Sequence, residues 1–91
     1  MLNEKIKADI NKCISGIADN YYGTTPYDED MECYVTISWK DSIWHAIDDF
    51  REDIAGYMEC YDYEDLTQEE IEEISDYAWN SVNTETIRKY A

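Results

Sequence analysis

Apolar residues recur along this chain at two spacings, and each spacing predicts one type of secondary structure. Near the start they follow one another at steps of three and four, which places them on one face of a helix. We therefore expect a helix over residues 3–19 that buries this face. Its apolar positions are Leu2, Ile6, Ile10, Cys13, Ile14 and Ile17.

A strict alternation of apolar and polar residues then predicts one clear strand over residues 32–39, where β-branched and aromatic residues dominate. A single strand is not stable alone, so it needs a second strand of this chain or of a partner chain. Residues 21–27, interrupted by Gly23 and Pro26, are the candidate within this chain. Residues 28–30 would form the turn between the two strands.

Helical spacing returns at residues 42–60, where Asp41 or Ser42 would cap the first turn. Gly56 marks an end or a kink of this helix. Residues 56–63 could therefore form a strand instead.

A capping box predicts the start of a further helix. Thr67 is the cap residue and Glu70 follows three positions later, so we expect a helix over residues 68–82. Thr84 would cap a short last helix at 85–90. The chain therefore predicts one α+β domain: an N-terminal helix, a small antiparallel sheet or hairpin around 21–39, two acidic helices and a short C-terminal helix.

Charge distinguishes this chain from other small domains. Eighteen of its 22 acidic residues lie within residues 28–76, where Lys40 and Arg51 are the only bases. This block therefore has a formal charge of −16, the remaining residues sum to +1, and the net charge of the chain is −15. The chain is 44% apolar and 14% aromatic, which favours a folded protein over a disordered one. Such a surface disfavours direct binding to nucleic acid or to a membrane and favours a basic protein partner.

The cysteines Cys13, Cys33 and Cys60 are odd in number and widely spaced, which is typical of reduced thiols in a cytoplasmic protein. The first residues do not resemble a signal peptide, and no apolar run approaches transmembrane length. We therefore expect a cytoplasmic protein.

The sequence offers little catalytic or metal-binding chemistry. His45 is the only histidine, and no cysteine lies at metal-ligand spacing from it. Asp28, Asp30 and Glu32 begin like a calcium loop, but the central glycine and the terminal glutamate of that motif are missing. We expect no cofactor, no metal site and no enzymatic activity.

In its composition and order of elements, the chain resembles phage-encoded anti-CRISPR and antirestriction proteins that mimic DNA. The resemblance is strongest to a small α+β form of type II-A anti-CRISPR inhibitor, in which an N-terminal helix and a small antiparallel sheet precede acidic helices. The resemblance covers most of the chain but includes no sequence motif. It implies binding to a CRISPR effector where the protospacer-flanking motif or duplex DNA enters, in the cytoplasm of a bacterial host and without catalysis.

Carboxylates at fixed positions on helices can approximate the charges of duplex DNA. A DNA mimic would present its acids to a CRISPR effector or a restriction enzyme, with two tyrosines as aromatic anchors. The alternative for these tyrosines is partial burial at the edge of the core. The candidate partner-binding residues are Asp28, Glu29, Asp30, Asp48, Asp49, Glu52, Asp53, Tyr61, Asp62, Tyr63, Glu64, Asp65, Glu69, Glu72, Glu73 and Asp76.

Two other interpretations remain open. The protein could be a regulator, such as an antitoxin or assembly factor, of a basic partner that does not act at a DNA site. The acids could also form the solvated surface of a protein from a high-salt organism. A monomer is compatible with the sequence, and so is a homodimer paired through the strand at 32–39.

Overall fold

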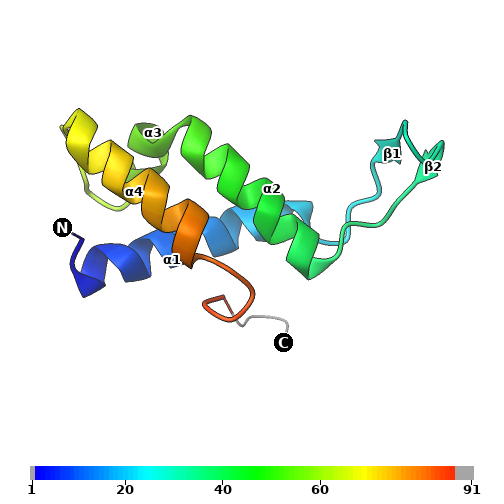
Figure 1. The fold of residues 1–91 in the computed structure, drawn as a ribbon, viewed down its shortest axis with the longest axis horizontal. Coiled ribbons are helices and arrows are strands. Elements are labelled where there is room, and N and C mark those ends of the chain that lie inside the picture. Colours follow the sequence, from blue (N-terminus) through cyan, green and yellow to red (C-terminus); the bar gives the residue numbers. More distant parts are fainter. Residues whose placement is uncertain (1, 88–91) are drawn as a thin grey trace.

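The computed structural model describes residues 2–87 and measures 43 × 25 × 21 Å. A long N-terminal helix is followed by a hairpin and three helices (Figure 1). The predicted α+β class and the order of elements are confirmed. The elements are α1 (Glu4–Tyr21), β1 (Tyr27–Asp28), β2 (Cys33–Tyr34), α2 (Trp39–Glu52), α3 (Ile54–Glu59) and α4 (Gln68–Ser81).

The core lies where α1 meets the three later helices. The predicted stripe of α1 is buried from Ile6 to Ile17, and Asn3 caps this helix by accepting a hydrogen bond from the Ile6 amide at 2.9 Å. Phe50 of α2 and Ile74 of α4 are fully buried in the same core. The later helices thus pack against α1 in one common hydrophobic core.

Helix α2 begins earlier than predicted. The Ser38 side chain accepts the amide of Asp41 at 3.2 Å, so Ser38 is the cap. Ser42 is instead buried and donates its hydroxyl to the Trp39 carbonyl at 2.6 Å. Trp39 is therefore helical, and its indole nitrogen donates to the carbonyl of Ile87 at 3.4 Å. The expectation that Asp41 or Ser42 caps this helix is wrong.

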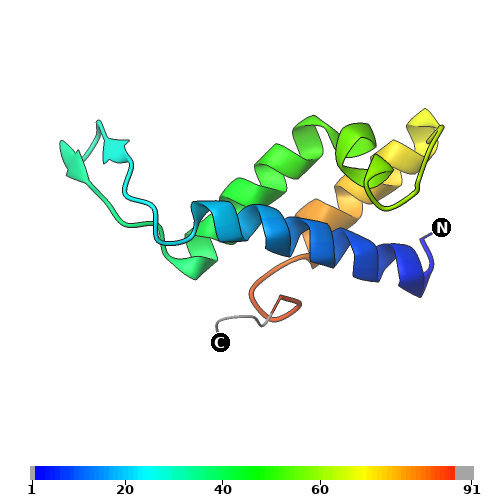
Figure 2. The same cartoon turned by 180° about the vertical axis from the view of Figure 1, so that it is seen from behind.

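The predicted strand at 32–39 is much shorter than expected. Two residues of β2 pair antiparallel with β1, with Tyr34 opposite Tyr27 and Cys33 opposite Asp28. Three backbone hydrogen bonds of 2.8–3.1 Å continue the ladder through residues 23–26 and 35–37. The hairpin projects beyond the end of α1 (Figures 1 and 2), and Tyr34 is 74% exposed. With no second layer over it, a two-stranded ribbon keeps little regular structure.

The predicted helix at 42–60 is two helices, and the predicted alternative strand at 56–63 does not form. The chain leaves helical geometry at Asp53, whose φ and ψ are −145° and 61°. The Asp53 carboxylate then caps α3 by accepting the Gly56 amide at 3.2 Å. A Cβ at Gly56 would clash with this carboxylate. Gly56 therefore allows the cap to form, while the break itself lies three residues earlier.

The predicted capping box of α4 is confirmed. The Thr67 hydroxyl accepts the Glu70 amide at 3.1 Å, and the Glu70 carboxylate accepts the Thr67 amide at 3.0 Å. These hydrogen bonds to the charged form lower the pKa of Glu70. Helix α4 ends at Ser81, one residue before the predicted end.

The predicted last helix at 85–90 lies partly outside the described residues. Within them, residues 84–86 form a turn. The Asn83 side chain accepts the amides of Glu85 and Thr86 at 2.8 and 3.2 Å, so Asn83 organises this turn where Thr84 was expected to act as a cap.

Removing the capping hydroxyl with Thr67→Ala should lower the free energy of unfolding by about 1 kcal/mol, because an amide of the first turn of α4 loses its acceptor. Gln68→Ala, one position later, is the matched control and should stay within about 0.5 kcal/mol of wild type. Urea unfolding followed by circular dichroism measures both. Equal stability of the two variants would show that the cap does not stabilise α4.

Candidate functional site

The structure separates the candidate partner-binding acids into two groups. Residues 28–30, the hairpin acids, lie at one end of the molecule (Figures 1 and 2). The second group, the helical acids, lies on the C-terminal half of α2, the loop after α3 and α4, toward the other end. The helical acids are Asp48, Asp49, Glu52, Asp53, Asp62, Glu64, Asp65, Glu69, Glu72, Glu73 and Asp76.

The helical acids are mostly exposed; Asp49 and Glu73 are half-buried. Residues 48–76 hold thirteen acids and one base, a formal charge of −12. That base, Arg51, donates from Nε to the Ser75 hydroxyl at 2.9 Å, and its guanidinium carbon lies 4.8 Å from the centre of the Trp79 ring. Arg51 is thus held against α4, in the middle of this acidic surface.

Four of the helical acids lie close in sequence to the contact between α2 and α4. Asp48 and Glu72 stand three positions before Arg51 and Ser75, so each shares a helix face with one member of that contact. Glu52 and Asp76 directly follow Arg51 and Ser75 and are exposed.

Two of the candidate acids also hold the fold together. The Tyr21 hydroxyl donates a hydrogen bond to the Asp49 carboxylate, which raises the pKa of Tyr21 to about 12. Asp53 caps α3 as described above. Substituting either residue therefore changes structure as well as charge.

The two candidate anchors, Tyr61 and Tyr63, are half-buried and pack against the core. The Tyr63 hydroxyl donates to the Asp9 carboxylate at 2.7 Å, and Lys5 pairs with the same carboxylate at 3.3 Å. The hydrogen bond from Tyr63 is the main reason that the pKa of Asp9 is lowered. The geometry therefore gives Tyr63 a structural contact, which fastens the loop after α3 to α1.

A third tyrosine makes a similar contact. Tyr77 of α4 donates its hydroxyl to the Asn11 side chain of α1 at 3.1 Å. Together with the pairs formed by Tyr21 and Tyr63, this contact ties each later part of the helical body to α1. Tyrosine hydroxyls are the neutral donors in all three contacts.

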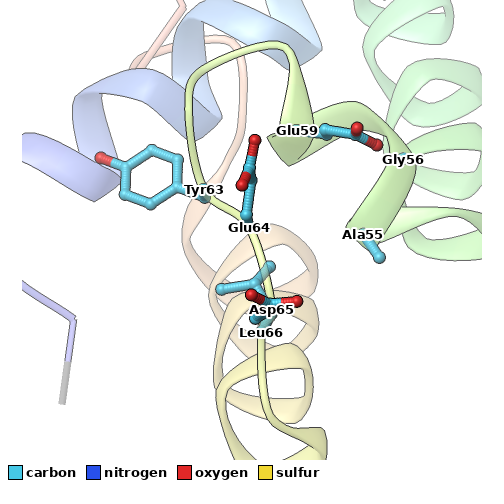
Figure 3. Close-up of a pocket in the computed structure, with 7 residues that line it drawn as sticks. All are labelled: Ala55, Gly56, Glu59, Tyr63, Glu64, Asp65 and Leu66. Carbon is cyan, nitrogen blue, oxygen red and sulfur yellow. The ribbon is translucent and has the colours of Figure 1, made fainter.

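The loop after α3 turns sharply and shapes an open acidic pocket. Asp62 and Asp65 have φ angles of +68° and +54°, a left-handed conformation that aspartate tolerates better than most residues. The pocket has a volume of about 380 Å³, and its acidic lining residues are Glu59, Glu64 and Asp65. Figure 3 shows the Tyr63 ring directed away from these carboxylates. Tyr63 is the aromatic residue that lines this pocket.

Sequence reasoning missed a second pocket between the hairpin and the start of α2. This groove has a volume of about 530 Å³ and is lined by apolar and acidic residues, with Trp44 at the α2 side. Trp44 is 48% exposed, and its ring meets that of Trp79 edge to face at 5.6 Å. Both tryptophans flank the apolar stripes of their helices, which is the sequence signal that could have identified them as exposed.

The three cysteine side chains differ in their exposure. Burial raises the pKa of the Cys13 thiol to about 11, whereas Cys33 and Cys60 are exposed, and all three thiols are free. Within residues 2–87 no group of three histidine, cysteine or acidic side chains could hold a metal ion. No helix in the same part of the chain is long and apolar enough to cross a membrane.

Comparisons of this chain with protein families, with characterised proteins and with solved structures find no match.

Replacing Tyr63 by phenylalanine should destabilise the protein at neutral pH, and the difference should shrink in acid. Folding lowers the pKa of this kind of carboxyl group, so the group stabilises the folded state at any pH above the pKa that it has in the unfolded chain. The stabilisation is lost as the pH falls from that pKa through the lower pKa of the folded state. For Asp9 this window begins near its ordinary pKa of 3.8 and extends below it.

Urea unfolding of wild type and Tyr63→Phe between pH 7 and pH 2.5 measures this difference. Tyr27→Phe, which changes an exposed ring of the hairpin, is the matched control and should behave as wild type at each pH. A Tyr63→Phe effect that is absent, or that is equal at pH 7 and pH 2.5, would contradict a contribution from the hydrogen bond to ionised Asp9.

Proposed function

We propose that this protein is a non-enzymatic inhibitor that mimics DNA and occupies the DNA-binding site of a bacterial defence nuclease, most specifically as an anti-CRISPR protein. The observation that carries the proposal is the surface of exposed helical acids, which spans α2, the loop after α3 and α4. A restriction enzyme is the other target of this class. In either case the protein acts in the cytoplasm of the host cell.

The charge density supports the proposal. Sixteen net negative charges of residues 28–76 over the 43 Å length of the molecule are one charge per about 2.7 Å. Duplex DNA carries one per about 1.7 Å of its axis. The two densities are of the same order, so a cationic groove that accommodates DNA would also attract this surface.

The helical acids are also placed on a supported framework. The core joins α1, α2 and α4, and Arg51 links α2 to α4 through Ser75. Carboxylates with fixed positions lose little freedom when they bind. Association with a basic partner should therefore be fast and should weaken steeply as salt is added.

One observation favours a second candidate function. Trp44 and Trp79 are exposed next to the acids, and exposed aromatic pairs suit contacts with a protein surface. A regulator of a basic partner that does not act at a DNA site, such as an antitoxin or an assembly factor, would use both features. Competition with DNA separates the two functions.

The test measures displacement of labelled duplex DNA from a guide-loaded type II CRISPR effector and from restriction endonucleases. Neutralising four helical acids together, with Asp48→Asn, Glu52→Gln, Glu72→Gln and Asp76→Asn, should weaken displacement at least tenfold. The matched control neutralises four acids outside the helical acids, the hairpin acids and the groove beside them: Glu4→Gln, Asp19→Asn, Glu32→Gln and Glu85→Gln. It should retain most of the displacement.

Circular dichroism and urea unfolding test whether both four-site variants fold. Binding to a nuclease without displacement of DNA would favour the regulator instead. Absence of binding to any of these nucleases at low salt, or equal displacement by the helical variant and wild type, would contradict the proposed inhibition through helical acids.

A further inference from the structure

The groove between the hairpin and α2 differs in chemistry from the acidic pocket after α3. Its apolar lining includes Tyr27, Val35 and Trp44. Its acidic lining consists of Asp28, Glu29 and Asp41; His45 also lines it, and no lysine or arginine among the described residues does. The groove therefore combines aromatic faces with carboxylates that have no lysine or arginine beside them in the lining.

The acids of this groove are not equivalent. The Asp28 carboxylate accepts the amides of Asp30 and Met31 at 2.9 and 3.3 Å, so it already holds the hairpin turn. Glu29 is exposed on the hairpin, and Asp41 is exposed in the first turn of α2. These two side chains approach the groove from opposite walls and can receive hydrogen bonds from a bound cation.

An arginine of this chain already lies against an aromatic ring next to the groove. The Arg51 guanidinium stacks over Trp79, whose ring contacts that of Trp44. Trp44 in turn lines the groove and is 48% exposed, while Tyr27 on the hairpin is 53% exposed. The protein thus presents a second exposed indole next to one that binds a guanidinium internally.

We propose that this groove docks an arginine-bearing segment of a basic protein partner, with the guanidinium against Trp44 and hydrogen-bonded to Glu29 or Asp41. Arginine fits this lining better than lysine, because its planar group stacks on aromatic rings and forms paired hydrogen bonds with carboxylates. A second copy of this chain is a poor occupant, since each copy carries a charge of −15.

The inference goes beyond the proposed function and does not depend on it. Any basic partner with an exposed arginine could use the groove, whether or not that partner binds DNA. The helical acids lie outside the groove, so the two surfaces can be tested separately.

The probe is a blocked hexapeptide of alternating glycine and arginine, compared with the same peptide containing lysine or neutral citrulline. Two-dimensional NMR of the ¹⁵N-labelled protein follows the Trp44 indole and the hairpin amides. The arginine peptide should shift these signals and bind several-fold more tightly than the lysine peptide. The citrulline peptide should show no saturable shift.

Trp44→Leu should weaken binding of the arginine peptide about fivefold. Glu29→Gln and Asp41→Asn together should weaken it by a similar factor, and they provide a second test should Trp44→Leu fail to fold. Neutralising Glu4 and Glu59 removes two charges that lie outside both the groove and the helical acids, and it is the control matched in charge. It should change the affinity less than twofold.

Three results would overturn the proposal: no saturable binding of the arginine peptide at low salt, equal affinity for the arginine and lysine peptides, or equal weakening by the groove variants and the control. The last two would indicate diffuse attraction to the charged surface. Displacement of DNA by the helical acids is read in the separate nuclease experiment, so failure of either proposal can be distinguished from failure of the other.

Discussion

The contact of α1 with the later helices is the constraint on which the remaining structure depends. Acids concentrated on α2 and α4 repel one another in the folded state, and this repulsion opposes folding. The opposing contribution comes from burial of the apolar stripe of α1 against residues such as Phe50 and Ile74. Helix α1 has three acids and three bases, so it brings apolar area to the acidic helices without adding net charge. The acidic surface is compatible with folding because its charges lie outside the apolar contact between α1 and the later helices.

Local chemistry made several elements predictable, and competing local chemistry explains the errors. The stripe of α1 and the capping box at Thr67 each lie within a few residues, so the sequence identifies them directly. Alternation at 32–39 favoured a strand, but the Ser38 cap starts a helix before that strand would end. The break at Asp53 depends on one side chain bonding to the Gly56 amide, which helical spacing alone does not reveal.

The candidate site was predictable in composition but not in arrangement. Sequence placed the acids in one block, yet their separation into two groups follows from the projection of the hairpin away from the helical body. The role of Tyr63 also depends on distance in the fold, because Asp9 lies 54 residues earlier in the chain. The place of Trp44 in the groove depends on where α2 begins and on where the hairpin lies, and the sequence pattern predicts neither.

The tyrosine contacts have a consequence for how the molecule is sensed at a distance. Tyr21 positions Asp49 with a neutral hydroxyl, so this contact cancels none of the charge of Asp49. The carboxylate that Tyr63 holds, Asp9, is also paired with Lys5. A lysine in the place of Tyr21 would have neutralised one negative charge of the acidic surface and weakened its electric field. That field extends about 10 Å into a solution of 0.1 M salt before ions screen it. A carboxylate that is held by a tyrosine hydroxyl keeps its full charge, so it attracts a cationic protein before the two surfaces are in contact.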